Sequence, residues 1–202
     1  MTNTAYDGAA IDGRAYLDVV DLAHRAPGWL DGLIAGWSAY GLGAFVLLML
    51  IAWWQARRAG TPAAVTALAV PLVTVLAFGV DSLLKLAVRE DRPCRRLHAA
   101  TLEACPAPGD WSFPSNHAAI ASAAAFALLL VSRRLGLIAL AAAIPMAASR
   151  VWVGVHYPHD VLIGFAVGAL VSLLATWAVR RKQSALAIRL EHGPLRRLLA
   201  AG

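Results

Sequence analysis

Several ionisable side chains stand at the ends of long apolar segments in this 202-residue sequence. Ionisable groups are costly at membrane depth, so they are candidates for a functional site. Cations stabilise the oxygens of a phosphoryl group, and one histidine can attack phosphorus while a second protonates the departing oxygen. Together these residue types suit phosphoryl transfer. They are Asp81, Lys85, Arg89, Arg92, His117, Arg150, His156, His159 and Asp160.

The first group of cations lies in the stretch KLAVREDRP. Lys85, Arg89 and Arg92 are spaced four and three residues apart, so they share one face if the helix continues. Pro93 predicts that the helix stops there. Taken alone, this pattern is typical of a helix end whose long cationic side chains reach toward the membrane surface.

The second group, FPSNH, opens an apolar segment. Ser115 after Pro114 is a good N-cap, with Asn116 and His117 in the first turn. The N–H groups at a helix N-terminus can bind an anion. Alone, however, a capped helix start with one histidine is more often structural.

The third group, SRVWVGVHYPHD, links two apolar segments. It places Arg150 at the end of one and His156 in the turn. Asp160 follows four residues later, in the first turn after Pro158. A carboxylate near a histidine orients the imidazole and raises its basicity. The same pair could also be a plain helix cap.

Membrane helices must position these groups. The sequence is 59% hydrophobic and only 15% charged, against about 25% charged in an average soluble domain. Five apolar segments are long enough to cross a bilayer, which takes about 20 residues. We therefore expect an all-α integral membrane bundle with no large soluble part. The segments are 32–54, 63–87, 116–132, 136–152 and 160–179.

Positive charge predicts the orientation. Arginine pairs follow the first and third segments, and Arg180, Arg181 and Lys182 follow the fifth. These places share one side if there are five spans, and the positive-inside rule makes it cytoplasmic. We therefore interpret the net charge of +6 as the result of arginines that orient the membrane helices, and not as a sign of nucleic-acid binding. The candidate residues then face the extracytoplasmic side of the cell membrane.

The two ends of the chain carry helical patterns of their own. The stretch AYLDVVDLAHRAPGWLDGL predicts a short helix lying on the outer membrane surface. ALAIRLEHGPLRRLLAAG predicts a second one on the inner surface, and the N-terminus does not read as a cleavable signal peptide. We expect a single domain, with 1–30 as the interfacial helix, 32–179 as the bundle and 180–202 as a basic cytoplasmic tail.

Both cysteines, Cys94 and Cys105, fall in the predicted outer loop. An extracytoplasmic location permits a disulfide. Such a bond would close a loop of about ten residues and stabilise the fold by roughly 2–3 kcal/mol. The alternative is two unrelated thiols.

The three groups, in order and spacing, resemble the type 2 phosphatidic acid phosphatase family. Its pattern is K-x6-R-P, P-S-G-H and S-R-x5-H-x3-D, and the resemblance covers about residues 80–165. The N-terminal third also looks like that of small bacterial members that dephosphorylate undecaprenyl diphosphate. Asn116 replaces the family's glycine. Asparagine tolerates unusual backbone angles, so we interpret this departure as a mark of a subgroup.

The resemblance implies a role for each matching residue. His156 would be the nucleophile that becomes phosphohistidine, Asp160 would orient it, and His117 would be the general acid. No metal or cofactor is implied. Phosphate binding is assigned to Lys85, Arg92, Ser115, Asn116 and Arg150.

Three of the ionisable residues match no position of the family. Asp81 lies four residues before Lys85, and we expect a local ion pair between them. His159 is interpreted as polar surface at a helix start, and Arg89 has no assigned role.

The resulting hypothesis is that the protein is a metal-independent phosphatase. It would remove a phosphate from undecaprenyl or decaprenyl diphosphate and so recycle a cell-wall lipid carrier. The same chemistry could act on phosphatidylglycerol phosphate, phosphatidic acid or a decaprenyl-phosphoryl sugar phosphate, or transfer the phosphate to another acceptor.

Two other classes fit the sequence less well. A proton-coupled transporter usually carries its charges near the midplane, between inverted repeats, and no internal repeat is visible. A zinc protein could use His117, His156, His159 and Asp160 as ligands, but the neighbouring cations would repel the metal.

Overall fold

The computed structural model describes residues 6–191 and 196–199, and this part is a helical bundle with one isolated bridge, Tyr6–Glu90. The predicted all-α class is confirmed. The helices are α1 (Ala9–Arg25), α2 (Gly28–Tyr40), α3 (Leu42–Ala59), α4 (Thr61–Val88), α5 (Pro93–Arg96), α6 (Asn116–Val131), α7 (Arg133–Trp152), α8 (Pro158–Glu191) and α9 (Arg196–Leu199).

Three helices, α4, α7 and α8, are long and apolar enough to cross a membrane, and a fourth span is present if α2 and α3 count as one. The remaining apolar helix, α6, has only 16 residues. Each of the five predicted segments corresponds to one of these elements. The structure shows a multi-span bundle, and the exact number of five spans stays a prediction.

The first predicted span is bent. α2 and α3 meet at Gly41 with an angle of 53° between them. A Cβ at Gly41 would lie 2.6 Å from Met146 Cε and 2.5 Å from the carbonyl oxygen of Trp37. Glycine therefore lets the bend pack closely against α7. Hydropathy gave the length of this segment but not its change of direction.

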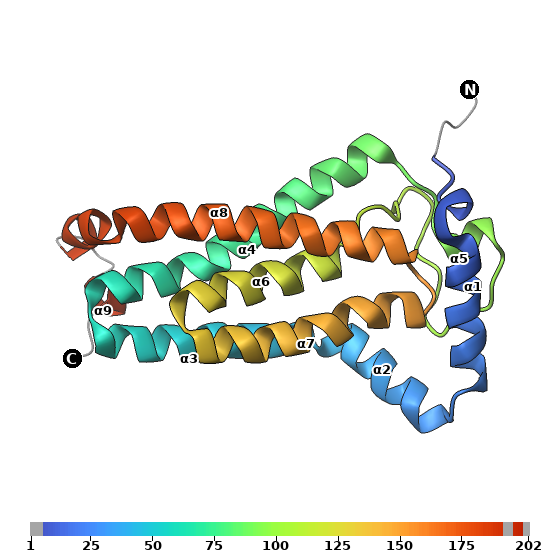
Figure 1. Cartoon of the computed structure of the whole chain (residues 1–202), viewed down its shortest axis with the longest axis horizontal. Helices are drawn as coiled ribbons and strands as arrows, with labels where there is room; N and C mark the ends of the chain where they lie inside the picture. Colours follow the sequence, from blue (N-terminus) through green and yellow to red (C-terminus); the bar gives the residue numbers. More distant parts are fainter. Residues whose placement is uncertain (1–5, 192–195, 200–202) are drawn as a thin grey trace.

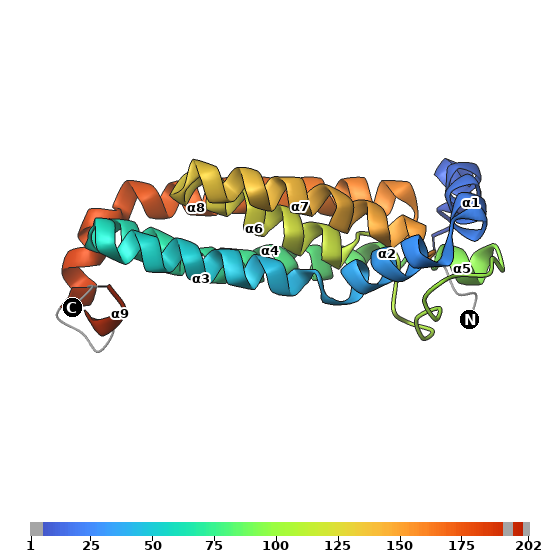
Figure 2. The ribbon, with the colours of Figure 1, turned by 90° about the horizontal axis from the view of Figure 1, so that it is seen from below.

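The predicted interfacial helix is split in two. α1 ends at Arg25, just before Pro27, and the second half of the predicted segment belongs to α2. Proline restricts the residue before it and ends a helix. α1 lies across one end of the bundle (Figure 1, Figure 2). Its Tyr16 and Val20 are buried there, and Tyr16 Oη donates to the Gly154 carbonyl at 2.9 Å.

α6 is the most buried of the bundle helices, and its alanines are fully covered on nearly every face. Its neighbour α8 brings Gly164 and Gly168 against it, one turn apart. A Cβ at Gly168 would lie 2.1 Å from the Ala119 carbonyl oxygen. Small residues spaced by four allow such close helix packing in membranes. This contact fixes the start of α6 against the start of α8.

The turns after α3 and α6 and the far end of α8 lie at the opposite end of the bundle from α1 (Figure 1). Their arginines are thus gathered at one end, as predicted. The predicted inner helix is different, because α8 continues without a break to Glu191. In α9, Leu199 packs against Ala64, Val65 and Ala187. Residues 192–195 and 200–202 of that predicted tail lie outside the described residues.

Candidate active site

The three sequence groups meet at the end of the bundle covered by α1 and α5 (Figure 1). The end of α4, the starts of α6 and α8 and the end of α7 all reach this place. Lys85, Arg92 and Arg150 are each close enough to act electrostatically on both His117 and His156. Residues from distant parts of the chain therefore form one cationic cluster around two histidines.

The hydrogen bonds of His156 define its tautomer. Arg92 Nη1 lies 2.9 Å from His156 Nε2, and Asp160 Oδ2 lies 3.2 Å from Nδ1. A guanidinium always donates, so Nε2 must be the acceptor and Nδ1 must carry the hydrogen. The lone pair of Nε2 therefore points into the cationic cluster. This is the atom that a nucleophilic histidine needs to expose.

His156 lies in the turn between α7 and α8, and its side chain is buried. Burial lowers the pKa of this imidazole well below its usual value, and the charges of Arg92, Lys85 and Arg150 lower it further. Its ring is therefore neutral at neutral pH and keeps its lone pair.

Asp160 is fully buried and uses one oxygen for three donors. Besides His156, the Ser112 hydroxyl donates to Oδ2 at 2.5 Å and the Tyr157 backbone N–H donates at 2.8 Å. These bonds fix the carboxylate behind the imidazole. Ser112 was missed by sequence reasoning, because it lies in a loop 48 residues from its partner.

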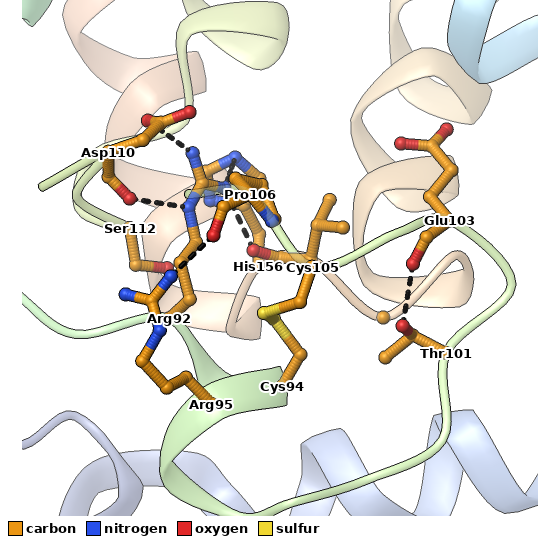
Figure 3. The surroundings of a disulfide bond; sticks show 12 residues. Arg92, Cys94, Arg95, Thr101, Glu103, Cys105, Pro106, Asp110, Ser112 and His156 are labelled. Carbon is orange, nitrogen blue, oxygen red and sulfur yellow. Dashed lines mark hydrogen bonds and ion pairs between the residues drawn. A yellow bond between two sulfur atoms is a disulfide. The ribbon is translucent and has the colours of Figure 1, made fainter. Parts of the chain in front are cut away.

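The cations of the first group are held by the outer loop. Arg92 donates to the Asp110 carboxylate at 2.8 Å and to the Val155 carbonyl at 2.9 Å (Figure 3). Lys85 Nζ donates to the backbone carbonyls of Trp111 and Ser112 at 2.8 and 3.2 Å. Both cations are buried, and this fixes their position before substrate binds.

Arg150 contacts two residues that sequence reasoning missed. Its Nη1 donates to the Ser38 hydroxyl of α2 and lies 3.2 Å from each carboxylate oxygen of Glu103. Ser38 also donates to Glu103 at 2.7 Å. Nε of Arg150 is buried and has no hydrogen-bond partner among the described residues. A phosphate oxygen would satisfy it.

The start of α6 supplies further polar groups. Ser115 is the N-cap residue, as predicted, but its side chain makes no capping bond. Its Oγ and Asn116 Oδ1 are buried without partners in the described part of the chain. The Ser115 N–H donates to the Asp160 carbonyl at 3.0 Å, and Gly164 allows this approach, because a Cβ there would lie 2.5 Å from the Ser115 carbonyl. The free hydroxyl can donate to an anion.

Two sequence expectations for the outlying residues, those for Asp81 and His159, are wrong. The helical face of Lys85, Arg89 and Arg92 required a helix that continues, but α4 ends at Val88, and Arg89 is exposed with a left-handed backbone. Asp81 is fully buried and makes no hydrogen bond in the described structure. The direct pair with Lys85 is not formed, because Lys85 turns to the outer loop.

His159 is not polar surface either. Its side chain is only 14% exposed and forms ion pairs with Asp12 and Glu90. The partners lie 147 and 69 residues away in the chain. No local spacing could reveal a contact between such distant residues.

The outer loop is tied back by a bond between Cys94 and Cys105, whose Cα atoms are 6.0 Å apart (Figure 3). Arg95 beside the first cysteine donates to the Pro106 carbonyl beside the second. This crosslink lies between Arg92, which contacts His156, and the stretch that carries Asp110. It is therefore placed to hold the loop over the site.

We expect both thiols to be protected in the unreduced protein. A maleimide reagent should label neither cysteine before reduction and both afterwards in denaturant. Reduction should lower the melting temperature, because an intact crosslink of this length stabilises by roughly 2–3 kcal/mol. Labelling of both cysteines without reduction would contradict the crosslink.

The carboxylate of Glu103 pairs with Arg150, which we assign to phosphate binding. Glu103→Gln should therefore tighten substrate binding. Removing a partly exposed charge pair of about 1 kcal/mol predicts a fall in KM of about fivefold, with kcat little changed. Steady-state phosphate release measures both. The exposed Asp18 of α1 provides the control Asp18→Asn. An unchanged or higher KM for Glu103→Gln would show that the contact does not compete with substrate.

The assembled groups can perform a two-step phosphoryl transfer. Three buried cations and a free serine hydroxyl can surround the phosphoryl oxygens. A neutral, oriented imidazole can attack phosphorus, and His117 in the first turn of α6 can protonate the leaving oxygen.

Comparison with known proteins finds phosphatases among the similar sequences. The model of the PAP2 superfamily matches residues 63–184. An undecaprenyl-diphosphatase of Sulfolobus acidocaldarius is 32% identical over 150 residues, 72% of this chain and 69% of that protein. Undecaprenyl-diphosphatase BcrC of Bacillus subtilis is 30% identical over 149 residues, 72% of each chain. A decaprenylphosphoryl-5-phosphoribose phosphatase of Mycobacterium tuberculosis is 41% identical over 100 residues, 49% of this chain and 53% of that protein.

Among solved structures, LpxE of Aquifex aeolicus shares the fold, with a TM-score of 0.57 at 22% identity, covering 82% of this chain and 94% of that one. The family match spans more than half of the sequence and includes nearly all of α4, the whole of α5, α6 and α7, and most of α8. The chain belongs to the PAP2 superfamily and is a membrane lipid phosphatase.

Proposed function

We propose that the protein hydrolyses a polyprenyl diphosphate, undecaprenyl or decaprenyl, to the monophosphate at the extracytoplasmic face of the cell membrane. The observation that carries the chemistry is the pairing of His156 Nε2 with Arg92 and of its Nδ1 with Asp160. Of the three relatives described above, the two that match the longer stretches of this chain are named undecaprenyl-diphosphatases, and this supports the choice of substrate.

The reaction proceeds in two displacements. His156 Nε2 attacks the terminal phosphorus, the bond from phosphorus to the bridging oxygen breaks, and His117 donates its proton to the departing prenyl phosphate. Water then attacks the phosphohistidine while His117 takes the water's proton. The bond between nitrogen and phosphorus breaks, and inorganic phosphate leaves. The cations hold the phosphoryl oxygens in both steps.

The isoprenoid tail stays in the bilayer while the head enters the site. An apolar groove of about 370 Å³ lies between α2 and α7 and includes Trp37, Pro145 and Ser149. Ser149 directly precedes Arg150. Its apolar lining supports entry of a lipid from the side in this place.

Five spans and an outward-facing site complete the proposal. α6 crosses as the third and shortest span, enclosed by its neighbours. The positive turns at the end of the bundle opposite to the site (Figure 1) support the orientation. Hydrolysis on that side would recycle the lipid carrier of cell-wall synthesis.

A panel of lipids tests the substrate. Purified protein in detergent is assayed for phosphate release from undecaprenyl diphosphate, a decaprenyl-phosphoryl ribose phosphate, phosphatidylglycerol phosphate and phosphatidic acid, with and without chelator. We expect the highest kcat/KM for the diphosphate and no effect of chelator. A higher value for any monoester would reassign the substrate. Product formed without free phosphate would indicate a phosphotransferase.

The second candidate is the ribose phosphate monoester. The match to the mycobacterial phosphatase covers only about half of each chain. Its identity of 41% is nevertheless higher than that of the two undecaprenyl-diphosphatases described above. A preference for this monoester over the diphosphate in the panel would favour it.

A further inference from the structure

A second histidine lies behind the catalytic pair, enclosed by carboxylates. His159 Nδ1 lies 2.8 Å from Asp12 Oδ1, and Nε2 lies 3.1 and 3.2 Å from the two oxygens of Glu90. Nε2 is also 3.5 Å from Asp160 Oδ1. The side chains of Glu90 and Asp160 are 1% and 0% exposed. The cluster joins α1, the segment after α4 and the start of α8.

The contacts indicate that His159 is an imidazolium. Each ring nitrogen faces a carboxylate, so each must carry a hydrogen to donate. A neutral ring would leave one lone pair against a carboxylate and three carboxylates without a local cation, which is costly for buried groups. Tyr157 stacks on the ring with centroids 5.4 Å apart, and Phe113 packs near it at 5.9 Å. These contacts fix the plane of the ring.

Asp160 connects this cluster to the reaction. Its Oδ2 receives the bonds from His156, Ser112 and Tyr157, whereas Oδ1 is buried and has no hydrogen-bond partner among the described residues. The nearest positive charge to Oδ1 is His159. Without it, Asp160 and the neighbouring Glu90 would be two buried like charges, and one of them would take up a proton. A protonated Asp160 is a poorer acceptor for His156 Nδ1–H.

We infer that His159, held by Asp12 and Glu90, is a positioning residue that keeps Asp160 ionised and thereby strengthens the hydrogen bond by which Asp160 orients His156. The inference rests on the proposed phosphohistidine chemistry. It also gives α1 a part in catalysis, because Asp12 belongs to this helix. Asp12 Oδ2 further accepts the backbone N–H of His159 at 2.7 Å, so α1 anchors the start of α8.

The test replaces His159 with glutamine, which keeps a hydrogen-bond donor for Glu90 but has no charge. Groups that orient the ligands of metal sites cost about 10- to 100-fold in activity when they are lost. We expect a loss of the same order in kcat here, with KM little changed. The acid limb of the pH profile should move to higher pH, because Asp160 then protonates more readily. His24→Gln, at an exposed position of α1, should leave both unchanged.

Titratable groups face His159 and Asp160 from every surrounding element. Because several of them act on the same pair, a double-mutant cycle is informative. They are Asp12, Lys85, Glu90, His156 and Tyr157. Asp12→Asn should lower kcat in the same direction but less. Combined with His159→Gln it should add little, because both changes act through one contact.

The hydrogen bond between Asp160 and His156 can be measured without turnover. The ¹⁵N spectrum of the histidines, with His156 assigned by its loss in His156→Ala, should show His156 protonated at Nδ1 in the wild type. In His159→Gln the Nδ1 signal should move upfield, because a protonated Asp160 accepts this hydrogen bond more weakly while Arg92 still donates to Nε2. A wild type that hydrolyses no polyprenyl diphosphate would overturn the proposed function but not this inference, which the spectrum tests separately.

Three results would overturn the inference. The first is a wild-type kcat and pH profile in His159→Gln with an unchanged His156 signal. The second is an equal loss at all pH values, which would indicate packing alone. The third is loss of wild-type activity in chelator with recovery in zinc. Glu90, His159 and Asp160 have ligand atoms within 4.8 Å of one another, so this outcome would assign His159 to a metal.

Discussion

His156→Ala should abolish phosphate release, with a loss of about 10⁴-fold or more, because removal of a covalent nucleophile stops both displacements. His156 is also the buried acceptor of a hydrogen bond from Arg92, so its loss frees that arginine. Melting temperature in detergent should confirm that the variant is folded. Activity within tenfold of the wild type, about 1.4 kcal/mol in the barrier, would show that another residue attacks phosphorus.

The pH dependence of the wild type follows from the same residue. The pKa of His156 is lowered by burial and by the neighbouring cations, so the ring becomes protonated only in acid. Activity should therefore fall as the pH drops through that lowered pKa and stay level on its neutral side as far as His156 is concerned. A limb near the usual histidine pKa of about 6.5 that does not move in His159→Gln would belong to His156 and not to Asp160, and it would indicate that the cations do not act on this ring.

His117→Ala should lower turnover of the lipid substrate by about 10²–10⁴-fold, the usual range for a lost general acid. The loss of activity should depend on how much the leaving group needs a proton, so a substrate with a good leaving group serves as the control. Release of p-nitrophenolate needs little protonation, so hydrolysis of p-nitrophenyl phosphate should fall much less. Equal losses on both substrates would mean that His117 binds phosphate and does not act as the acid.

Local spacing was enough to find the residues that meet at the site. Lys85, Arg92, Ser115, Arg150 and His156 come from three short stretches, each with its own internal spacing. The structure brings the three stretches together because α6 packs tightly on α8 through glycines. Helix class and the positions of the apolar segments were readable from hydropathy alone.

The residues that support the site could not be predicted from the sequence, because their contacts join distant positions. Asp12 meets His159 across 147 residues, and Ser38 meets Arg150 across 112. In sequence, Asp12 is one more polar residue of an amphipathic helix, and Ser38 is a small residue in an apolar segment. Only the docking of α1 and the bend at Gly41 give them partners. Hydropathy likewise records the length of a span but not its direction.

The central claim is that three distant segments form one site in which His156 takes up the phosphoryl group. Rapid quenching in base during turnover of a substrate with a ³²P-labelled terminal phosphate tests this most directly. We predict an acid-labile, base-stable label on the peptide that contains His156, and its absence in His156→Ala. The same label in His156→Ala, or no labelled enzyme in the wild type during rapid turnover, would contradict the account.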